Sequence, residues 1–331
     1  MEPILGPILE CCCGVDVHKN MIEACIIKGI KEPEYIRKRF STFQNELIEF
    51  VNWLYENDCF HIAMESTGVY WRPVYEAIEE FSPYYENIIV ANAHHMRNIP
   101  GRKTDVKDAE WIATLMQHGL LESSFVPDRN IRDLREFSRT YKNAISEKSR
   151  CLNRLEKFLQ THGFKLSSVL SDINSVSGIN ILTILSQKGS LTIDDIENAV
   201  GRNTKKSPEE IQSAICGRLN ANECFLLADF LNQLRLIEQH IELILNKMIE
   251  IAEPYKDILE KLDSIIGIDI TAALLILAEI GSDVQKNFQT AGHLCSWAGL
   301  KPRNDESAEK YKSKKVMHGN PYIKSILCQC A

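Results

Sequence analysis

The sequence has no long apolar run and no excess of basic residues. It contains no stretch of about 18 apolar residues, so no segment is expected to span a membrane. The N-terminal segment MEPILGPILECCCG has neither a basic start nor a long apolar stretch, so no secretory signal is expected either. The formal net charge is −7, which taken alone argues against a nucleic-acid partner.

Cysteines are present, but they lack the spacing of a zinc site. The chain has 11 of them, an odd number without a single C-x-x-C pair, and zinc sites usually contain such pairs. The triplet Cys11, Cys12 and Cys13 directly precedes an apolar strand pattern, where reduced cysteines are commonly buried. These features predict a reducing, cytoplasmic location.

Basic residues gather in two stretches although the whole chain is acidic. Residues 129–157 carry nine Lys and Arg against four Asp and Glu, and residues 301–324 carry seven against three. A local basic stretch in an acidic chain can still form a face that binds phosphates. The charge distribution therefore leaves a nucleic-acid partner open, within a composition typical of soluble globular proteins.

The first third of the chain alternates between strand and helix patterns. Three short apolar strands with polar turns are expected within 11–40. After them the pattern predicts a helix, a strand, a helix, a strand and a helix, at 44–56, 61–66, 69–81, 87–93 and 105–118. Pro73 suits a first helical turn, and Gly119 suits a helix end. This order predicts an α/β domain with a mixed sheet.

The middle of the chain changes to long helical patterns. Apolar residues from 131 to 159 nearly alternate by three and four, and a second run does so without interruption. Such a stripe is typical of a coiled coil, and its partner is either the earlier helix of the same chain or another subunit. Shorter elements are expected at 160–221. The uninterrupted stripe consists of Phe230, Leu234, Ile237, Ile241, Ile244, Met248 and Ile251.

Near the C-terminus, residues 258–281 predict a helix, a short glycine turn and a second helix. Such a segment resembles a helix-hairpin-helix, which can offer backbone amides to a phosphate. An ordinary helical hairpin in a core is an equally good interpretation.

Four carboxylates suggest a metal site. Asp16 lies within an apolar strand, Glu65 ends another strand, and Asp105 and Asp108 are three residues apart at the start of a helix. Carboxylates at the ends of adjacent strands and on one helix face converge. Two Mg²⁺ ions held about 4 Å apart by such groups catalyse phosphoryl transfer. The alternative for Asp105 and Asp108 is an ordinary pair of charges at a helix N-terminus.

Several long motifs resemble those of the DEDD-type insertion-sequence transposases (insertion-sequence family one-ten). The similar segments are GVDVHKN with Asp16, MESTGVYW with Glu65, NIPGRKTDVKDAEWIATLMQHGLL with Asp105 and Asp108, LDSIIGIDITAALLILAEIG, and SWAGLKPRNDES…KKVMHGNPYIKSIL. The resemblance covers almost the whole chain and is weakest at 160–221. It implies an RNase H-like (RuvC-like) catalytic domain at 10–125, a helical coiled-coil region at 126–257 with an insert at 160–221, and an all-α C-terminal transposase domain at 258–331.

The resemblance also implies a serine nucleophile, which falls on Ser307. The glycines that follow this serine in the family are replaced here by Ala308 and Glu309. Basic residues near the two sites are expected to contact nucleic acid, although those on the first long helix also suit a solvated coiled-coil face. The expected contacts are Arg102, Lys103, Arg132, Arg135, Arg139, Arg303, Lys310, Lys312 and Lys314.

The function implied is a DNA transposase that cuts and rejoins strands with Mg²⁺ and a serine. The expected partners are DNA, a structured guide RNA and further copies of the chain in a dimer or tetramer. Family members usually continue beyond the position of Ala331, so one alternative is a truncated, inactive nucleic-acid-binding protein. The other is an RNase H-like nuclease or junction resolvase that does not use the serine.

Overall fold

The structure is a computed structural model that describes residues 9–66, 68–81, 85, 87–92, 96, 108–201, 206–302, 305–307, 310–313, 316 and 318–331. For the segments 305–307 and 310–313 it describes the backbone alone. The chain forms two compact units, Met1–Val126 and Pro127–Ala331.

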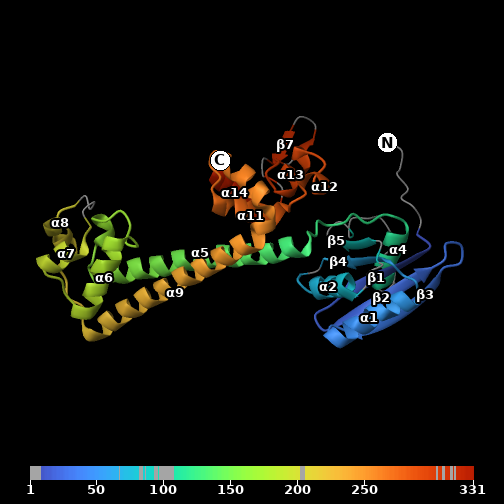
Figure 1. The fold of residues 1–331 in the computed structure, drawn as a ribbon, viewed down its shortest axis with the longest axis horizontal. Coiled ribbons are helices and arrows are strands. Elements are labelled where there is room, and N and C mark those ends of the chain that lie inside the picture. Colours follow the sequence, from blue (N-terminus) through green and yellow to red (C-terminus); the bar gives the residue numbers. More distant parts are fainter. Residues whose placement is uncertain are drawn as a thin grey trace. The chain divides into compact units, whose positions relative to one another are not determined.

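The first unit is built on a five-stranded mixed sheet (Figure 1). The strands are β1 (Cys11–Val17), β2 (Met21–Lys28), β3 (Glu34–Ser41), β4 (His61–Glu65) and β5 (Asn87–Ala91), in the spatial order β3-β2-β1-β4-β5. The first three strands form an antiparallel meander, and β4 and β5 run parallel to β1. The prediction of an α/β domain with a mixed sheet is confirmed.

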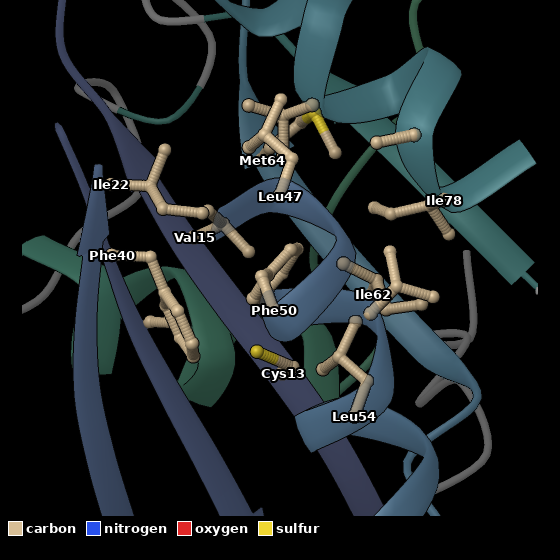
Figure 2. Close-up of a cluster of buried hydrophobic side chains, with 14 of the residues drawn as sticks. Cys13, Val15, Ile22, Phe40, Leu47, Phe50, Leu54, Ile62, Met64 and Ile78 are labelled. Atoms are coloured by element: carbon tan, nitrogen blue, oxygen red, sulfur yellow. The ribbon is translucent and has the colours of Figure 1, made fainter. Parts of the chain in front are cut away.

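One face of this sheet is covered by α1 (Gln44–Glu56) and α2 (Trp71–Phe81). Alternate strand residues such as Val15, Ile22 and Met64 point into this layer, because successive side chains of a strand face opposite sides. Figure 2 shows them packed against the apolar stripe of α1, where Phe50 meets Phe40 edge to face with ring centroids 5.3 Å apart. This layer is the main core of the unit.

The opposite face is covered by α4 (Asp108–Gln117). Here Cys12 and Ala63 from the strands meet Ile112 and Met116 from the helix. A Cβ at Gly14 would lie 2.2 Å from the carbonyl oxygen of Ala109 and 2.3 Å from the amide nitrogen of Ala113. The backbone of α4 therefore rests directly on β1, and only glycine at position 14 leaves it room.

The second unit contains the two long helices, α5 (Arg129–Thr161) and α9 (Ala221–Ala252), which lie side by side (Figure 1). They are antiparallel, because Lys148 forms an ion pair with Glu238 at 2.8 Å, and His162 lies 3.4 Å from Glu223. Leu234, Ile244 and Met248 of the predicted stripe are buried. Of the two partners considered for the stripe, the structure shows the helix of the same chain.

The segment between the long helices forms a small helical cluster on α9. Its elements are η1 (Leu166–Ser168), α6 (Val176–Lys188), α7 (Ile193–Ala199) and α8 (Pro208–Ala214). Leu182 and Leu185 of α6 share one buried cluster with Leu155 of α5 and Leu227 of α9. The insert thus completes a core at one end of the helical pair.

The C-terminal part packs on α5 through α11 (Ile270–Ile280). It also contains η2 (Glu253–Tyr255), α10 (Lys256–Asp263), α12 (Val284–Asn287), α13 (Ala291–Trp297) and α14 (Pro321–Cys330). The prediction that this part is all-α is wrong, because β6 (Asp305–Ser307) and β7 (Lys310–Ser313) form an antiparallel hairpin. The two strands are short and polar, with Lys310 and Lys312 in the second. They therefore lack the apolar face by which a strand is recognised in a sequence.

Among the described residues, no helix has both the length and the apolar character needed to cross a bilayer.

Candidate active site

Asp16 lies on the α4 face of the sheet. On β1, Cys13 and Val15 point into the core under α1 and α2, whereas Cys12 and Gly14 face α4. Asp16 continues the second series, and 16% of its side chain is exposed. The period of two residues in a strand therefore places this carboxylate beside α4, away from the main core.

Two further carboxylates lie on the same side of the sheet. Glu65 ends β4, two residues after Ala63, which also faces α4. Asp108 is the first residue of α4 itself. The pKa of Asp16 is raised mainly by burial, and the negative charges of Asp108 and Glu65 raise it further, while His18 opposes them. The charges of two predicted acidic residues, Glu65 and Asp108, thus act on a third, Asp16.

His18 is a neighbour of this cluster that the sequence interpretation missed. Its Nε2 lies 3.0 Å from Oδ2 of Asp16, and 57% of its side chain is exposed. Residues two apart on an extended chain share a face. The pair D-x-H in GVDVHKN was therefore a usable signal for this contact.

The donor set suits a hard cation better than a soft one. Asp16, Glu65 and Asp108 supply carboxylate oxygens, which Mg²⁺ prefers. Within the described part of the chain, no three metal-binding side chains stand close enough to hold an ion. Asp105, the fourth member of the predicted set, lies outside the described residues. The chemistry of the three described carboxylates fits Mg²⁺, and a bound cation would offset the negative charge around Asp16.

Two arginines on β3 lie on the same face as Asp16, and the sequence interpretation missed them as well. Glu23 pairs with both Asp16 and Arg39 across the strands, so these three residues form one row across the sheet. Arg37 lies in the next row on this face and forms an ion pair with Glu110 of α4, and Arg39 forms one with Glu23. A cavity of about 190 Å³ opens between these side chains. Strand alternation in YIRKRF could have revealed that these two arginines share one face.

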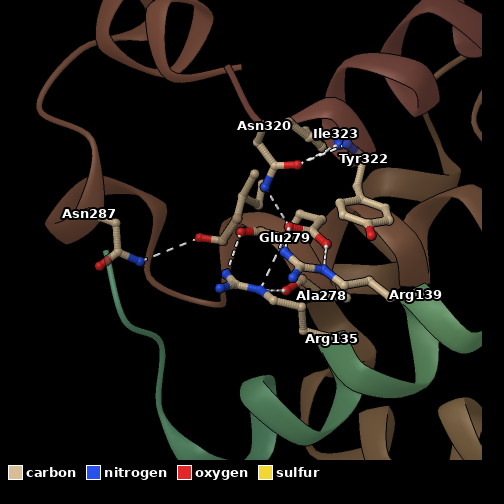
Figure 3. A network of polar contacts seen from close by, with 9 residues as sticks. Arg135, Arg139, Ala278, Glu279, Asn287, Asn320, Tyr322 and Ile323 are labelled. Atoms are coloured by element: carbon tan, nitrogen blue, oxygen red, sulfur yellow. Dashed lines mark hydrogen bonds and ion pairs between the residues drawn. The ribbon is translucent and has the colours of Figure 1, made fainter. Parts of the chain in front are cut away.

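The three arginines predicted on α5 have partners inside the chain. Arg132 is buried and donates to the carbonyl oxygen of Pro127 at 3.0 Å. Arg135 donates to the carbonyl oxygens of Ala278 and Glu279, and Arg139 donates to both carboxylate oxygens of Glu279 (Figure 3). Burial lowers the pKa of Arg135 to about 10, although the Glu279 charge opposes this. The contacts of Arg135 and Arg139 hold α11 on α5.

The predicted serine lies in the C-terminal hairpin. Ser307 is the last residue of β6 and pairs with Lys310, the first residue of β7. Lys312 follows on β7, and the side chains of all three are outside the description. Four other predicted contacts, Arg102, Lys103, Arg303 and Lys314, also lie outside the described residues.

Two family models match the chain. A model for DEDD transposases of the IS110 type, described as "Transposase", matches residues 13–164. A second model, described as "Transposase IS116/IS110/IS902 family", matches residues 259–331. The first match contains the acidic cluster, and the second contains the hairpin with Ser307. No curated protein matches the chain.

Proposed function

Because the chain belongs to the IS110 family of DEDD transposases, we propose that it joins two chemistries in one DNA recombination reaction. An acidic, magnesium-binding site on an RNase H-like (RuvC-like) domain activates the scissile phosphate, and Ser307 of the C-terminal transposase domain attacks it. We assign residues 10–125 to the RNase H-like domain and residues 258–331 to the C-terminal transposase domain, with the helical region 126–257 between them. The chain is a DNA transposase, and these residues are our assignment of its active groups.

The observation that carries the proposal is that the charges of two further carboxylates on the α4 face act on Asp16. Asp108 and Glu65 raise the pKa of the half-buried Asp16, so negative charge gathers around Asp16 and favours a bound cation. With Asp105 they form the proposed tetrad, which has enough oxygens for two Mg²⁺ ions. Bound Mg²⁺ supplies charge stabilisation at the attacking and leaving oxygens.

The proposed covalent step exchanges one phosphodiester for another. The Oγ of Ser307 forms a bond to phosphorus while the bond from phosphorus to the leaving strand oxygen breaks. The hydroxyl proton passes to a base, and the leaving oxygen takes up a proton. A hydroxyl of a second strand then attacks the serine ester and releases Ser307. Ester bonds are conserved throughout, so the exchange requires no oxidant and no nucleotide.

We further propose that one DNA strand crosses the sheet beside β3. Arg37 and Arg39 are about half exposed or more, at 48% and 65%; Arg39 lies in the row of Asp16 and Arg37 in the next row. Their exposed ion pairs stabilise the fold little, and a guanidinium has five N–H donors, so each can bind a phosphate as well. The other proposed contacts are Arg102, Lys103, Arg303, Lys310, Lys312 and Lys314; we leave out the three α5 arginines, which Pro127, Ala278 and Glu279 already engage.

A guide RNA and self-association complete the proposal. The outer face of α9 carries the exposed apolar residues Phe225, Leu236 and Leu243, at 73%, 60% and 69% exposure. Spacings of eleven and seven residues align them along one line of a helix. Such a line favours a second copy of the chain, in a dimer or tetramer.

The proposed guide RNA has its own test. A discrete RNA encoded next to the gene and co-purifying with the protein would support the guide, whereas bulk ribosomal RNA alone would contradict it.

Two substitutions test the chemistry. Asp16→Asn is expected to abolish strand cleavage while the chain stays folded, because a neutral amide cannot replace a carboxylate on Mg²⁺. Ser307→Ala is expected to abolish the covalent protein–DNA adduct on a denaturing gel. Cleavage in EDTA would contradict the metal site. Cleavage by Ser307→Ala with unchanged products would instead indicate a nuclease that does not use the serine.

A further inference from the structure

The hairpin that carries Ser307 is closed at its base by a series of backbone contacts. The backbone amide of Asn320 donates to the carbonyl oxygen of Trp297 at 3.0 Å. A Cβ at Gly319 would lie 2.2 Å from the amide nitrogen of Gly299, so the two chain segments touch there. Pro302 then bridges to Val316, and β6 pairs with β7 above it. The described contacts between the two arms of the hairpin thus begin at Asn320 and recur as far as β6 and β7.

The side chain of Asn320 ties this base to two helices at once. Its Oδ1 accepts from the backbone amides of Tyr322 and Ile323 at 2.9 and 3.3 Å, which caps α14. Its Nδ2 donates to Oε2 of Glu279 at 2.6 Å, and Glu279 belongs to α11 (Figure 3). The amide uses its oxygen as an acceptor and its nitrogen as a donor at the same time, and an ionised carboxylate, which has no donor, could not do this.

Glu279 connects Asn320, at the base of the hairpin, to α5. Its side chain is fully buried, and Arg139 donates to its two carboxylate oxygens at 3.0 and 3.2 Å. The guanidinium of Arg139 also lies 4.4 Å from the ring centroid of Tyr322 on α14. A buried carboxylate with well-formed bonds admits few alternative geometries, because any shift leaves a charge unpaired. Glu279 thus joins α5, α11 and the start of α14 in one rigid contact.

We propose that Glu279 and Asn320 are positioning residues for Ser307. They fix the base of the hairpin on α5 and α11, so that the serine is held at a defined place relative to this framework. The inference rests on the proposed role of Ser307 as nucleophile. Attack on phosphorus requires close alignment, and a displacement of about 1 Å can slow a reaction roughly a hundredfold.

The decisive test reverses the hydrogen bond between the two side chains. Asn320→Asp keeps the acceptor that caps α14 but loses the donor and places a second carboxylate against Glu279. Glu279→Gln keeps the shape but removes the charge. In the double variant, the new amide at position 279 can donate to the new carboxylate at position 320, and one negative charge remains near Arg139. The control is Asn287→Asp, the same chemical change at an amide that donates to the carbonyl oxygen of Ile280 at 3.4 Å.

Adduct formation and DNA affinity are measured for each variant. Each single variant is expected to form the serine adduct about a hundredfold more slowly with an unchanged Kd for DNA. The double variant is expected to recover to within about tenfold of the natural chain, since coupled residues are not additive. The control should be unchanged. Single variants with full adduct rates, or a double variant as slow as the singles, would overturn the inference.

Hydrogen exchange separates this inference from the proposed chemistry. In Asn320→Asp, the backbone amides of β6 and β7 are expected to exchange faster, while those in the middle of α11 keep their protection. The double variant should restore slow exchange. Absence of any serine adduct in the natural chain would refute the nucleophile. Unchanged exchange of the hairpin in Asn320→Asp would refute the anchorage, whatever the chemistry of the serine.

Discussion

Single residues set the geometry of the acidic site, and Gly14 matters as much as the carboxylates. The helix that begins with Asp108 can lie beside Asp16 because residue 14 has no side chain. A larger residue there would push the first turn of α4 away from β1. The distance between the two carboxylates therefore depends on a residue without any functional group.

Gly14→Ala is expected to lower both stability and activity. The added Cβ would overlap the backbone of Ala109 and Ala113, and overpacking of this kind costs about 1–3 kcal/mol. Urea denaturation measures the loss, and cleavage assays below the unfolding transition should show weaker apparent Mg²⁺ affinity. Gly292→Ala is the control, because its nearest contact for a Cβ is an ordinary 3.7 Å. Equal stability of both variants would contradict the close approach.

A local rule was enough to place some of the predicted residues in the fold. Asp16 and Glu65 stood out because carboxylates interrupt apolar strands, and strand alternation then fixes their face. Arg135 and Arg139 show the limit of that reasoning. Their spacing correctly predicts one helix face, but their partner Glu279 is about 140 residues away in the chain. No periodicity in the sequence reveals whether such a face meets phosphate or a buried carboxylate.

At the scale of elements, the edge strand β3 offers a matched comparison between its two faces. Arg39 lies in the row of Asp16, whereas the neighbouring Lys38 points the other way and lies 4.8 Å from the ring centroid of Phe40. The two cations are adjacent in sequence and both lie on an exposed edge. Only the first is on the face of the acidic cluster.

Arg39→Gln is expected to weaken DNA binding, and Lys38→Gln is expected to leave it nearly unchanged. Loss of one phosphate contact lowers the slope of log K against log salt by about 1. Fluorescence anisotropy with a labelled oligonucleotide, repeated over a range of salt concentrations, measures this slope. Equal slopes for the two variants would contradict the proposed path. A loss confined to an RNA probe would show that this face serves RNA instead.

Helix α9 offers a similar comparison between its inner and outer faces. Ile244 is 5% exposed against α5, and the preceding Leu243 is 69% exposed. Ile244→Asp should lower the free energy of unfolding by at least about 3 kcal/mol, because it places a charge in a packed contact. Leu243→Asp should leave the unfolding transition unchanged but reduce the mass seen by light scattering. An unchanged mass for Leu243→Asp would argue against self-association through this face.

The helical stripe also shows what the sequence could and could not predict of the fold. Its period predicts that Leu234, Ile244 and Met248 face a helix, and they do. The period says nothing about which helix, because α5 of the same chain and a second copy satisfy it equally well. The hairpin of β6 and β7 escaped prediction because its short, polar strands have no apolar face.

At the scale of the whole molecule, the proposed tetrad and the proposed nucleophile belong to different compact units. The acidic residues lie before Val126, and Ser307 lies after Pro127. A reaction that needs both can use the two units of one chain or units from two chains. If α9 joins two copies through its outer face, a site shared between chains is the arrangement we expect.

Mixing two inactive chains distinguishes these arrangements. An Asp16→Asn chain has an intact serine, and a Ser307→Ala chain has an intact tetrad. If sites are shared in a dimer, each mixed dimer contains one site with both groups intact and one with neither. Equal mixing then restores roughly a quarter of the natural number of sites, measured as recombined DNA.

If each chain uses its own groups, every site in the mixture lacks one of them. Absence of recombination, in a mixture that still binds DNA and still forms mixed dimers, would therefore refute the shared site and assign both chemistries to a single chain.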